Sequence, residues 1–313
     1  MRMAVGNFPL GGKIVIVTGG GSGINLAFVK LVLEKGARVV VADLSLSDEA
    51  RGFISTSNKE GEVVVFQRCD VSNWGELESL IPFAEKQFGL VPDVYIAGAG
   101  VFEPVNIISQ TCPPFADKNL EPHFWTNTEK SGYKVVDINL NHPIKLTRLA
   151  LEALAKKQQK GVVLVVGSMT AFSPQYSSPL YCATKAGVTL FVRSMEDADE
   201  REGVKVVLIC PGIVETPLWK DRPDVRSGLT GEGFITPEHV ARSMVDLIED
   251  GNYGGGTVLE VSSNELPRVL PVWDITPPEI SWIPGPEEID RMNSITPDNS
   301  EETQRGPMNW VIL

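Results

Sequence analysis

Cysteine and histidine are scarce in this sequence of 313 residues. There are four cysteines with no Cys-x-x-Cys pair, and three histidines that are far apart along the chain. Disulfide frameworks and zinc sites need closely spaced ligands of these two types. The composition therefore speaks against a disulfide-stapled domain and against a metal site. It favours a reduced, cytoplasmic compartment.

Positive charge and long apolar runs are also in short supply. The chain has 28 Lys and Arg against 40 Asp and Glu, which gives a formal net charge of -12. A charge of this sign repels phosphate backbones and anionic lipid surfaces. The most apolar stretch, Val162–Val166, is far too short to cross a bilayer. We therefore expect neither a nucleic-acid partner nor a membrane partner.

Short runs rich in Val and Ile alternate with segments of helical periodicity. Runs such as IVIV, VVVA and VVLVV are apolar at every position, which is typical of strands that helices cover on both faces. Right-handed crossovers between such strands give a doubly wound sheet. The sequence predicts an α/β fold, a Rossmann-type parallel sheet. Its seven strands are expected at residues 13–18, 37–43, 62–70, 93–97, 162–168, 204–210 and 257–262, and its main helices at 23–36, 143–159, 181–201 and 237–249.

Two segments interrupt this alternation. Residues 102–133 are long for a connection and hold four prolines, which indicates an ordered surface insertion. Residues 266–313 contain eight prolines and three tryptophans, so they cannot be regular helix or sheet throughout. We expect one domain over residues 8–265, followed by a tail at 266–313 that lies over the active site or against a partner subunit.

A glycine-rich turn, TGGGSGIN at residues 18–25, follows the first expected strand and opens the first expected helix. Glycine tolerates positive φ and lets backbone N–H groups approach a pyrophosphate at the helix N-terminus. The strand–turn–helix setting predicts a dinucleotide site, whereas glycine turns alone occur in many loops. Asn25 stands where a third glycine often sits.

Two carboxylates follow the next two expected strands. Asp43 lies about twenty residues beyond the turn, where a carboxylate accepts both ribose hydroxyls of NAD and repels the 2'-phosphate of NADP. The cofactor predicted is therefore NAD, the competing interpretation being a solvated carboxylate at a strand end. Asp70 is placed either to contact the adenine or to cap the following helix.

Tyr181 and Lys185 stand four residues apart on one face of an expected helix. A neighbouring cation favours the phenolate and lowers the tyrosine pKa, which would let the phenol move a substrate proton. Ser168, at the end of the fifth strand, is expected beside the phenol. Asn139 either holds a proton-relay water near Lys185 or serves as a cap or helix-bending amide.

Taken together, TGGGSGIN, AD, CDV, AGAG, INL, GS, YCATK and PGIVET resemble the short-chain dehydrogenase/reductase family over about residues 8–263. YCATKAG and ICPGIVET are similar to its NAD-dependent 15-hydroxyprostaglandin dehydrogenase-like members and their fungal relatives. The resemblance implies an NAD-binding catalytic domain with a tetrad of Asn139, Ser168, Tyr181 and Lys185. It also implies a homodimer or homotetramer. The cofactor contacts expected are Gly19, Gly21, Ser22, Gly23, Ile24, Asp43, Leu44, Asp70, Val71, Ala97, Gly98, Tyr181, Lys185, Pro211, Gly212, Val214 and Thr216.

The chain departs from the family pattern at two places. One is Asn25, and the other is AGAG at residues 97–100, which stands where the family has Asn-Asn-Ala-Gly and lacks its amide side chains. Neither departure affects the expected tetrad. We expect an NAD-dependent oxidoreductase that interconverts a secondary alcohol and a ketone on a bulky, largely apolar small molecule. The alternatives are a ketoreductase of natural-product biosynthesis and an NAD-binding scaffold without turnover.

Overall fold

The computed structural model describes residues 4–60, 63–102, 133–175, 178–219, 234–262 and 266–272. All seven predicted strands are present, and they form one sheet in the order β3-β2-β1-β4-β5-β6-β7, with an eighth strand at the end. The seven pair in parallel throughout, and the predicted fold class is confirmed. The strands are β1 (Ile14–Thr18), β2 (Arg38–Asp43), β3 (Val63–Arg68), β4 (Val94–Ala97), β5 (Gly161–Val166), β6 (Val204–Pro211), β7 (Val258–Val261) and β8 (Arg268–Val269).

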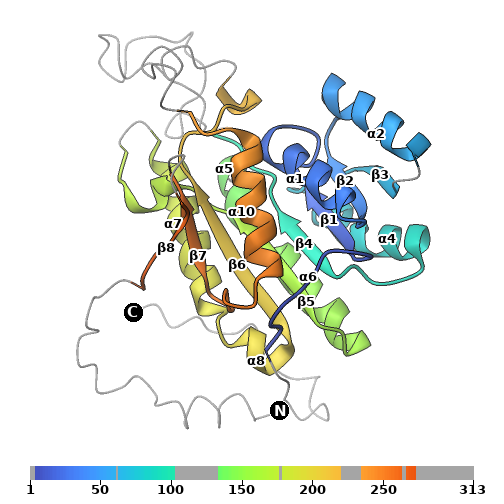
Figure 1. Cartoon of the computed structure of the whole chain (residues 1–313). Helices are drawn as coiled ribbons and strands as arrows, with labels where there is room; N and C mark the ends of the chain where they lie inside the picture. Colours follow the sequence, from blue (N-terminus) through green and yellow to red (C-terminus); the bar gives the residue numbers. More distant parts are fainter. Residues whose placement is uncertain are drawn as a thin grey trace, which may run out of the picture. The chain divides into compact units, whose positions relative to one another are not determined.

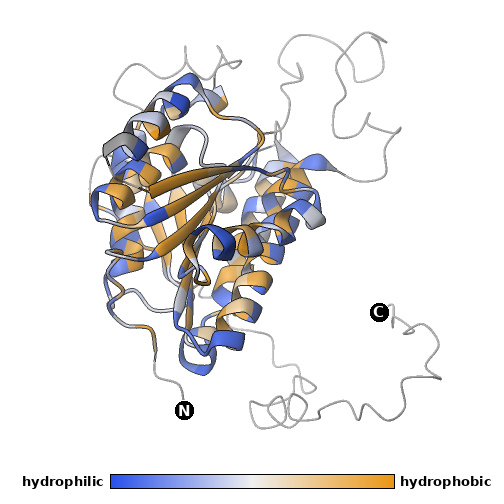
Figure 2. Cartoon of the chain, turned by 90° about the vertical axis from the view of Figure 1, so that its right-hand side faces the viewer, coloured by the Kyte–Doolittle hydropathy of each residue, from blue (hydrophilic) through white to orange (hydrophobic). Residues whose placement is uncertain are grey.

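Helices cover both faces of the sheet (Figure 1). Val15 and Val17 of β1 point to the face covered by α1 and α10, whereas Ile16 points to the face covered by α4, α6 and α7. Successive strand residues alternate between two buried faces, so the strands are apolar throughout and colour as continuous hydrophobic arrows (Figure 2). The helices are α1 (Gly23–Glu34), α4 (Leu80–Phe88), α6 (His142–Lys157), α7 (Pro179–Ser194) and α10 (Pro237–Glu249).

Two of the predicted helices have different ends in the structure. The helix expected at 181–201 is divided at residues 195–197 into α7 and a short α8, which ends at Gly203 in the left-handed conformation. The helix expected at 143–159 is preceded by a π-helical turn, Asp137–Asn141. The remaining helical segments are α2 (Asp48–Glu60), α3 (Trp74–Glu78), α5 (Lys134–Val136), α8 (Ala198–Glu202) and the 3₁₀ turns Met169–Phe172 and Pro217–Trp219.

The eighth strand lies within residues 266–313, which the sequence predicts to be a tail. β8 pairs antiparallel with β7, and Arg268 forms an ion pair with Glu260 across the two strands. Arg193, in the last turn of α7, donates hydrogen bonds to the carbonyls of Leu270 and Pro271 at 3.0 and 2.7 Å. The chain therefore folds back along the edge of the sheet after β7. Most of the predicted insertion and the tail beyond Val272 lie outside the described residues.

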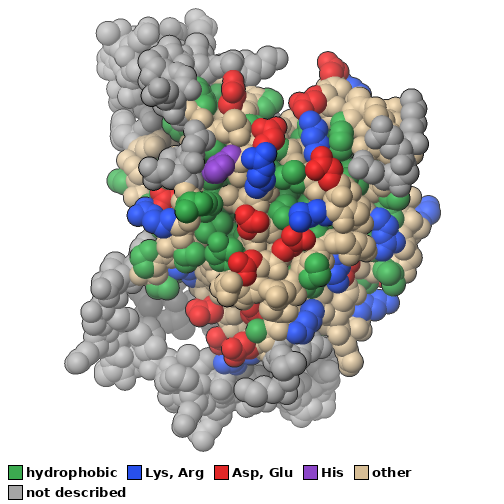
Figure 3. Space-filling model, viewed as in Figure 1, with side chains coloured by type: hydrophobic (Ala, Val, Ile, Leu, Met, Phe, Trp, Pro, Cys, Tyr) green, Lys and Arg blue, Asp and Glu red, His purple; other side chains and the backbone are tan. Residues whose placement is uncertain are grey.

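The face covered by α1 and α10 carries acidic and basic side chains side by side (Figure 3). One such pair joins the two helices, because Lys35, just after α1, contacts Glu249 at the end of α10 at 2.9 Å. Across the described ranges, none of the helices combines the length and the apolar character that a membrane crossing requires.

The strand order places the functional region. The chain moves outward from β1 to β3 on one side and then returns to β4 on the other side of β1. In a doubly wound sheet this reversal opens a crevice at the carboxyl ends of the two central strands, and ligands bind there. Both the glycine turn, after β1, and AGAG, at the end of β4, lie at this crevice.

Candidate active site

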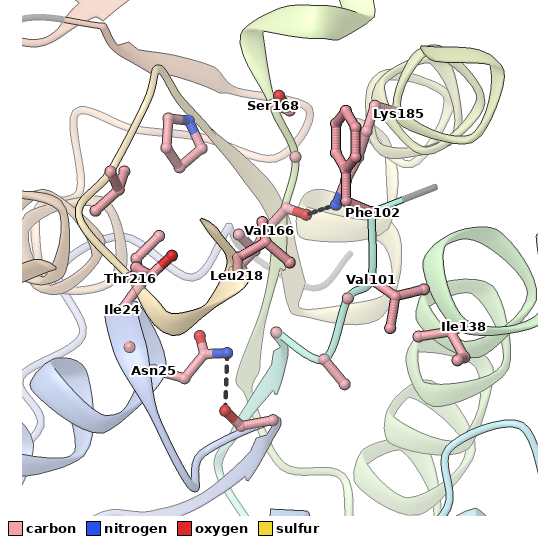
Figure 4. A pocket seen from close by; sticks show the side chains of 18 of the residues that line it. Ile24, Asn25, Val101, Phe102, Ile138, Val166, Ser168, Lys185, Thr216 and Leu218 are labelled. Carbon is pink, nitrogen blue, oxygen red and sulfur yellow. Dashed lines mark hydrogen bonds between the residues drawn. The ribbon is translucent and has the colours of Figure 1, made fainter. Parts of the chain in front are cut away.

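A cavity of about 650 Å³ lies at the carboxyl ends of the strands. Its walls come from the turns after β1, β2, β3, β4, β5 and β6 and from the start of α7, so residues far apart in sequence meet there (Figure 4). The predicted residues that line the cavity are Gly19, Ser22, Gly23, Ile24, Asp43, Leu44, Asp70, Val71, Gly98, Ser168, Tyr181, Lys185, Pro211, Gly212, Val214 and Thr216.

Sixteen of the nineteen predicted site residues therefore line the cavity. The other three lie behind its wall. Gly21 is buried in the glycine turn, Ala97 is buried within β4, and Asn139 is only 1% exposed. The Ala97 side chain belongs to the core on the α6 face of the sheet, so the contact predicted for this residue would be made by its backbone.

The glycine turn passes very close to the end of β4. Gly19 has a φ of +70°, and a β-carbon there would lie 2.7 Å from Ala99 Cα. Gly23 has a φ of +58°, so it too occupies a conformation that favours glycine. The Ser22 side chain does not cap α1, which leaves the first turn of the helix open to an anion.

Asp43 is tied to this turn from the end of β2. Its Oδ2 accepts a hydrogen bond from the Gly21 N–H at 2.9 Å, and a β-carbon on Gly21 would lie 2.8 Å from the same oxygen. Its Oδ1 accepts a longer bond from the Ser45 N–H at 3.4 Å. A carboxylate has about four acceptor positions, so capacity remains for hydroxyl donors in the cavity.

Asp70 does not cap the helix that follows β3. That role belongs to Asn73, whose side chain accepts hydrogen bonds from Gly75 N–H and Glu76 N–H. The Asp70 carboxylate instead accepts the N–H and the hydroxyl of Ser72, and this side-chain hydrogen bond lowers its pKa. The capping alternative is therefore wrong, and Asp70 lines the cavity beside Val71.

Tyr181, Lys185 and Ser168 come together at the α7 side of the cavity. Lys185 Nζ lies 5.6 Å from the centre of the Tyr181 ring and donates to the Val166 carbonyl at 2.8 Å (Figure 4). Ser168 hydrogen bonds to Tyr181, and its oxygen also accepts from the Thr170 hydroxyl at 2.9 Å. Two of these side chains lie on one face of α7 and the third follows β5, so a phenol, an ammonium group and a hydroxyl meet in the cavity.

Burial dominates the electrostatics of these groups. It raises the pKa of Tyr181 to about 12, and the hydrogen bond with Ser168 offsets only part of that rise. Burial also lowers the pKa of Lys185 to about 8. The predicted lowering of the tyrosine pKa is therefore wrong for the protein without a ligand, because loss of water disfavours the charged form of both groups.

Asn139 occupies the π-helical turn ahead of α6. Its Nδ2 donates to the Val101 carbonyl at 2.8 Å, and its Oδ1 accepts from the Val101 N–H at 2.9 Å. A β-carbon on Gly100 would lie 3.5 Å from Asn139 Oδ1 and 3.8 Å from Lys185 Nζ. The amide therefore holds the chain after β4 against the helix, close to Lys185. Single π turns of this kind are frequent at functional sites.

The cavity fits a nicotinamide dinucleotide. A β-carbon on Gly19 would collide with the backbone of Ala99, so glycine is required there, and Gly19, Ser22 and Gly23 line the cavity where a pyrophosphate can lie. The carboxylate of Asp43 and the side chain of Lys185 line the same cavity. Within the described part of the chain, no cluster of three His, Cys, Asp or Glu side chains is arranged to hold a metal ion.

The family follows from a match over most of the fold. The sequence model of the short chain dehydrogenase family covers residues 13–226, from β1 to the loop after β6. This chain belongs to the short-chain dehydrogenase/reductase family. It is accordingly an oxidoreductase of a family that acts on alcohols with a nicotinamide cofactor.

Named relatives of this dehydrogenase differ in substrate. It is 31% identical to the L-fucose dehydrogenase of Bos taurus over 263 residues, which are 80% of this chain and 88% of that protein. It is 25% identical to the 15-hydroxyprostaglandin dehydrogenase [NAD(+)] of Mus musculus over 272 residues, 81% and 91% of the two chains. The crystal structure of the NADPH-dependent 3-quinuclidinone reductase from Rhodotorula rubra is similar in fold, with a TM-score of 0.65, 24% identity and coverage of 81% and 91%.

Sequence reasoning did not place two features of this dehydrogenase's cavity. Phe102 stacks at a tilt on Tyr181, with ring centres 4.6 Å apart, and lies 5.3 Å from the ring of Trp219. These aromatic residues come from segments far apart in the sequence, and no periodicity could show that their rings meet. Asn25 also lines the cavity, with its carboxamide against Gly98.

A buried histidine, which the sequence analysis left without a role, joins the central strand ends. His142, at the start of α6, is fully buried, with Nδ1 3.0 Å from the Ile138 carbonyl and Nε2 3.0 Å from the Thr18 hydroxyl. Thr18 Oγ1 also accepts from the Gly98 N–H at 3.0 Å. The Thr18 hydroxyl also lies 2.8 Å from the Ile96 carbonyl, to which it can donate its hydrogen instead of donating it to His142 Nε2. Burial, with a smaller contribution from the charge of Lys185, lowers the pKa of His142 to about 4.

The buried contact between Thr18 and His142 predicts that the free energy of unfolding falls in acid. The folded-state pKa of about 4 lies below the ordinary value of 6.5, so folding favours the neutral ring. This contribution is complete above pH 6.5 and is lost as the pH falls from 6.5 to 4, and it amounts to about 3 kcal/mol at most. Urea unfolding at pH values between 7.5 and 4.5 should show it.

The matched comparison uses the His142→Gln and His239→Gln variants, because His239 lies on α10, away from the contact between Thr18 and His142. His142→Gln should have a lower free energy of unfolding at pH 7.5 and a flatter dependence on pH. His239→Gln should keep the dependence of the wild-type protein. Equal slopes in the wild-type and His142→Gln proteins would show that His142 does not cause the acid sensitivity.

Proposed function

We propose that this protein is an NAD-dependent oxidoreductase that interconverts a secondary alcohol and a ketone on a bulky, largely apolar substrate. The observation that carries the proposal is the meeting of Tyr181, Lys185 and Ser168 in the same cavity as the glycine turn and Asp43. A proton-transfer group and a dinucleotide-shaped cradle are the two parts that such a reaction needs.

The residues assigned to the cofactor follow from their place in the cavity. The glycine turn and the start of α1 would hold the pyrophosphate, Asp43 the adenosine ribose, and Lys185 the nicotinamide ribose. The turn after β6, from Pro211 to Thr216, would hold the carboxamide through its backbone. Asp43 supports NAD over NADP, and the name of the mouse relative agrees with this choice. When bound, the nicotinamide supplies the hydride acceptor or donor.

The proton chemistry is assigned to Tyr181. With a pKa raised to about 12, the phenol is neutral at pH 7 and has a proton to give to a developing alkoxide. Ser168 is placed to donate a second hydrogen bond to the same oxygen. Lys185 is assigned to place a positive charge near the phenol. Asn139 is assigned to fix the backbone at Val101, with which it exchanges two hydrogen bonds, at its position beside Lys185.

The substrate class is argued from the walls of the cavity. Phe102, Met169, Leu218 and Trp219 line it and offer apolar or aromatic surface, and the ring of Phe102 contacts that of Tyr181. Such a wall favours a bulky apolar group next to the carbinol carbon over a small polar alcohol. The neutral phenol equally suits the alternative of a ketoreductase that works toward the alcohol. Initial rates measured in both directions would distinguish the two.

Replacement of Tyr181 by Phe tests the catalytic assignment. The change removes one oxygen and keeps the ring, so the rate with secondary alcohols should fall roughly 100- to 10,000-fold, while the Kd for NAD should stay within about twofold. The rate is followed at the absorbance of the reduced nicotinamide. Tyr253→Phe, outside the cavity, is the matched control and should retain full activity. A Tyr181→Phe enzyme with most of its activity would place the acid–base group elsewhere.

Asp43 should set the choice of cofactor. A carboxylate that faces a 2'-phosphate costs roughly 1 to 3 kcal/mol, or about 5- to 150-fold in Kd, so the protein should bind NAD more tightly than NADP by that factor. Tryptophan fluorescence titrations with both cofactors measure it. Asp43→Asn should bring the Kd values for NAD and NADP closer together. Asp197→Asn, at the exposed residue just before α8, should leave the ratio of the two Kd values unchanged. Equal affinity of the wild-type protein for the two cofactors would contradict the assignment.

A further inference from the structure

The carboxamide of Asn25 occupies the space next to Gly98 at the end of β4. A β-carbon on Gly98 would lie 2.5 Å from Asn25 Nδ2 and 2.6 Å from Asn25 Cγ. Atoms cannot approach this closely, so a side chain at position 98 and the amide at position 25 exclude each other. The two departures from the family pattern noted in the sequence are therefore in direct contact.

The hydrogen bonds of Asn25 determine which way its amide faces. Nδ2 donates to the Gly19 carbonyl at 3.2 Å and to the Thr18 carbonyl at 3.4 Å. The opposite orientation would place the amide oxygen against two carbonyl oxygens, which repel it. Oδ1 therefore points the other way, and it is a buried acceptor with no hydrogen-bond partner in the described structure.

This free acceptor belongs to the cavity wall. Asn25 is 7% exposed and lines the same cavity as Asp43 and Lys185. Figure 4 shows the carboxamide of Asn25 and the side chain of Lys185 on different walls of this cavity. A buried acceptor without a donor is unfavourable, so a donor from a ligand would stabilise it. An amide oxygen does not attract a phosphate, which also offers only oxygen acceptors at neutral pH.

We propose that Asn25 is a cofactor-positioning residue, whose Oδ1 accepts a hydrogen bond from a ribose hydroxyl of the dinucleotide while Gly98 leaves room for the amide. The inference rests on the proposed function. A ribose hydroxyl suits this place because Asn25 follows the glycine turn assigned to the pyrophosphate, which has only acceptors, and the groups joined to the pyrophosphate are the two riboses, whose hydroxyls are donors. The amide thereby connects the cofactor to the end of β1.

The first test measures whether positions 25 and 98 are coupled in the protein without ligand. Gly98→Ala should lower the melting temperature by about 3 to 8 °C, because the new methyl group meets the amide. In the Asn25→Gly background the same change should shift it by less than about 2 °C. Equal shifts in both backgrounds would overturn the proposed exclusion, and this cycle requires no cofactor.

The second test measures binding by calorimetry. Asn25→Ala should weaken NAD about three- to tenfold, the effect of one lost hydrogen bond, and should weaken ADP-ribose by the same factor, since it contains both riboses but no nicotinamide. Unchanged affinity for both ligands would overturn the proposal. Weakening of NAD alone would assign the donor to the carboxamide and overturn the ribose assignment. A wild-type protein that binds no dinucleotide would instead refute the proposed function.

Discussion

The close approach of two backbone segments governs this site. The turn after β1 passes so near the end of β4 that a β-carbon on Gly19 would meet Ala99. Parallel strands bring their carboxyl ends to one edge, and here the reversal of the strand order leaves a crevice at that edge. The glycines allow the turn to enter the crevice, and the exposed backbone then becomes the surface on which a pyrophosphate can lie.

Polar side chains hold this approach in place. Thr18 hydrogen bonds to the end of β4 and to His142, while Asn25 donates to the backbone of the turn. Asn139 adds a pair of hydrogen bonds between Val101 and the π-helical turn. These groups are buried, so each depends on its partner, since an unpaired polar group away from water is costly. The same contacts connect the cofactor side of the cavity to the catalytic side.

Desolvation, rather than attraction between neighbours, decides the protonation of the free site. Tyr181 and Lys185 are close enough to interact, yet burial raises the pKa of the first and lowers that of the second. Both groups therefore favour their neutral forms more than they would in water. A site in this state holds its phenolic proton at neutral pH, which is the form that reduction of a ketone requires.

Much of the fold and site was predictable from the sequence, because these features depend on local patterns. Apolar runs predicted all seven parallel strands, and a strand followed by glycines predicted the turn at residues 18–25, since both reflect the backbone requirements of nearby residues. Motif spacing likewise placed Tyr181, Lys185 and Ser168 at one cavity. The antiparallel β8 was missed because two residues carry no periodic signal.

What the tertiary structure alone decided depends on contacts between distant segments. The sequence shows Asn25, Gly98, Thr18 and His142 as separate residues, and only their packing reveals that an amide fills the space at one glycine and that an imidazole meets a threonine. The pKa of Tyr181 was predicted in the wrong direction for the same reason: spacing reveals a neighbouring cation, whereas burial depends on every segment that covers the ring.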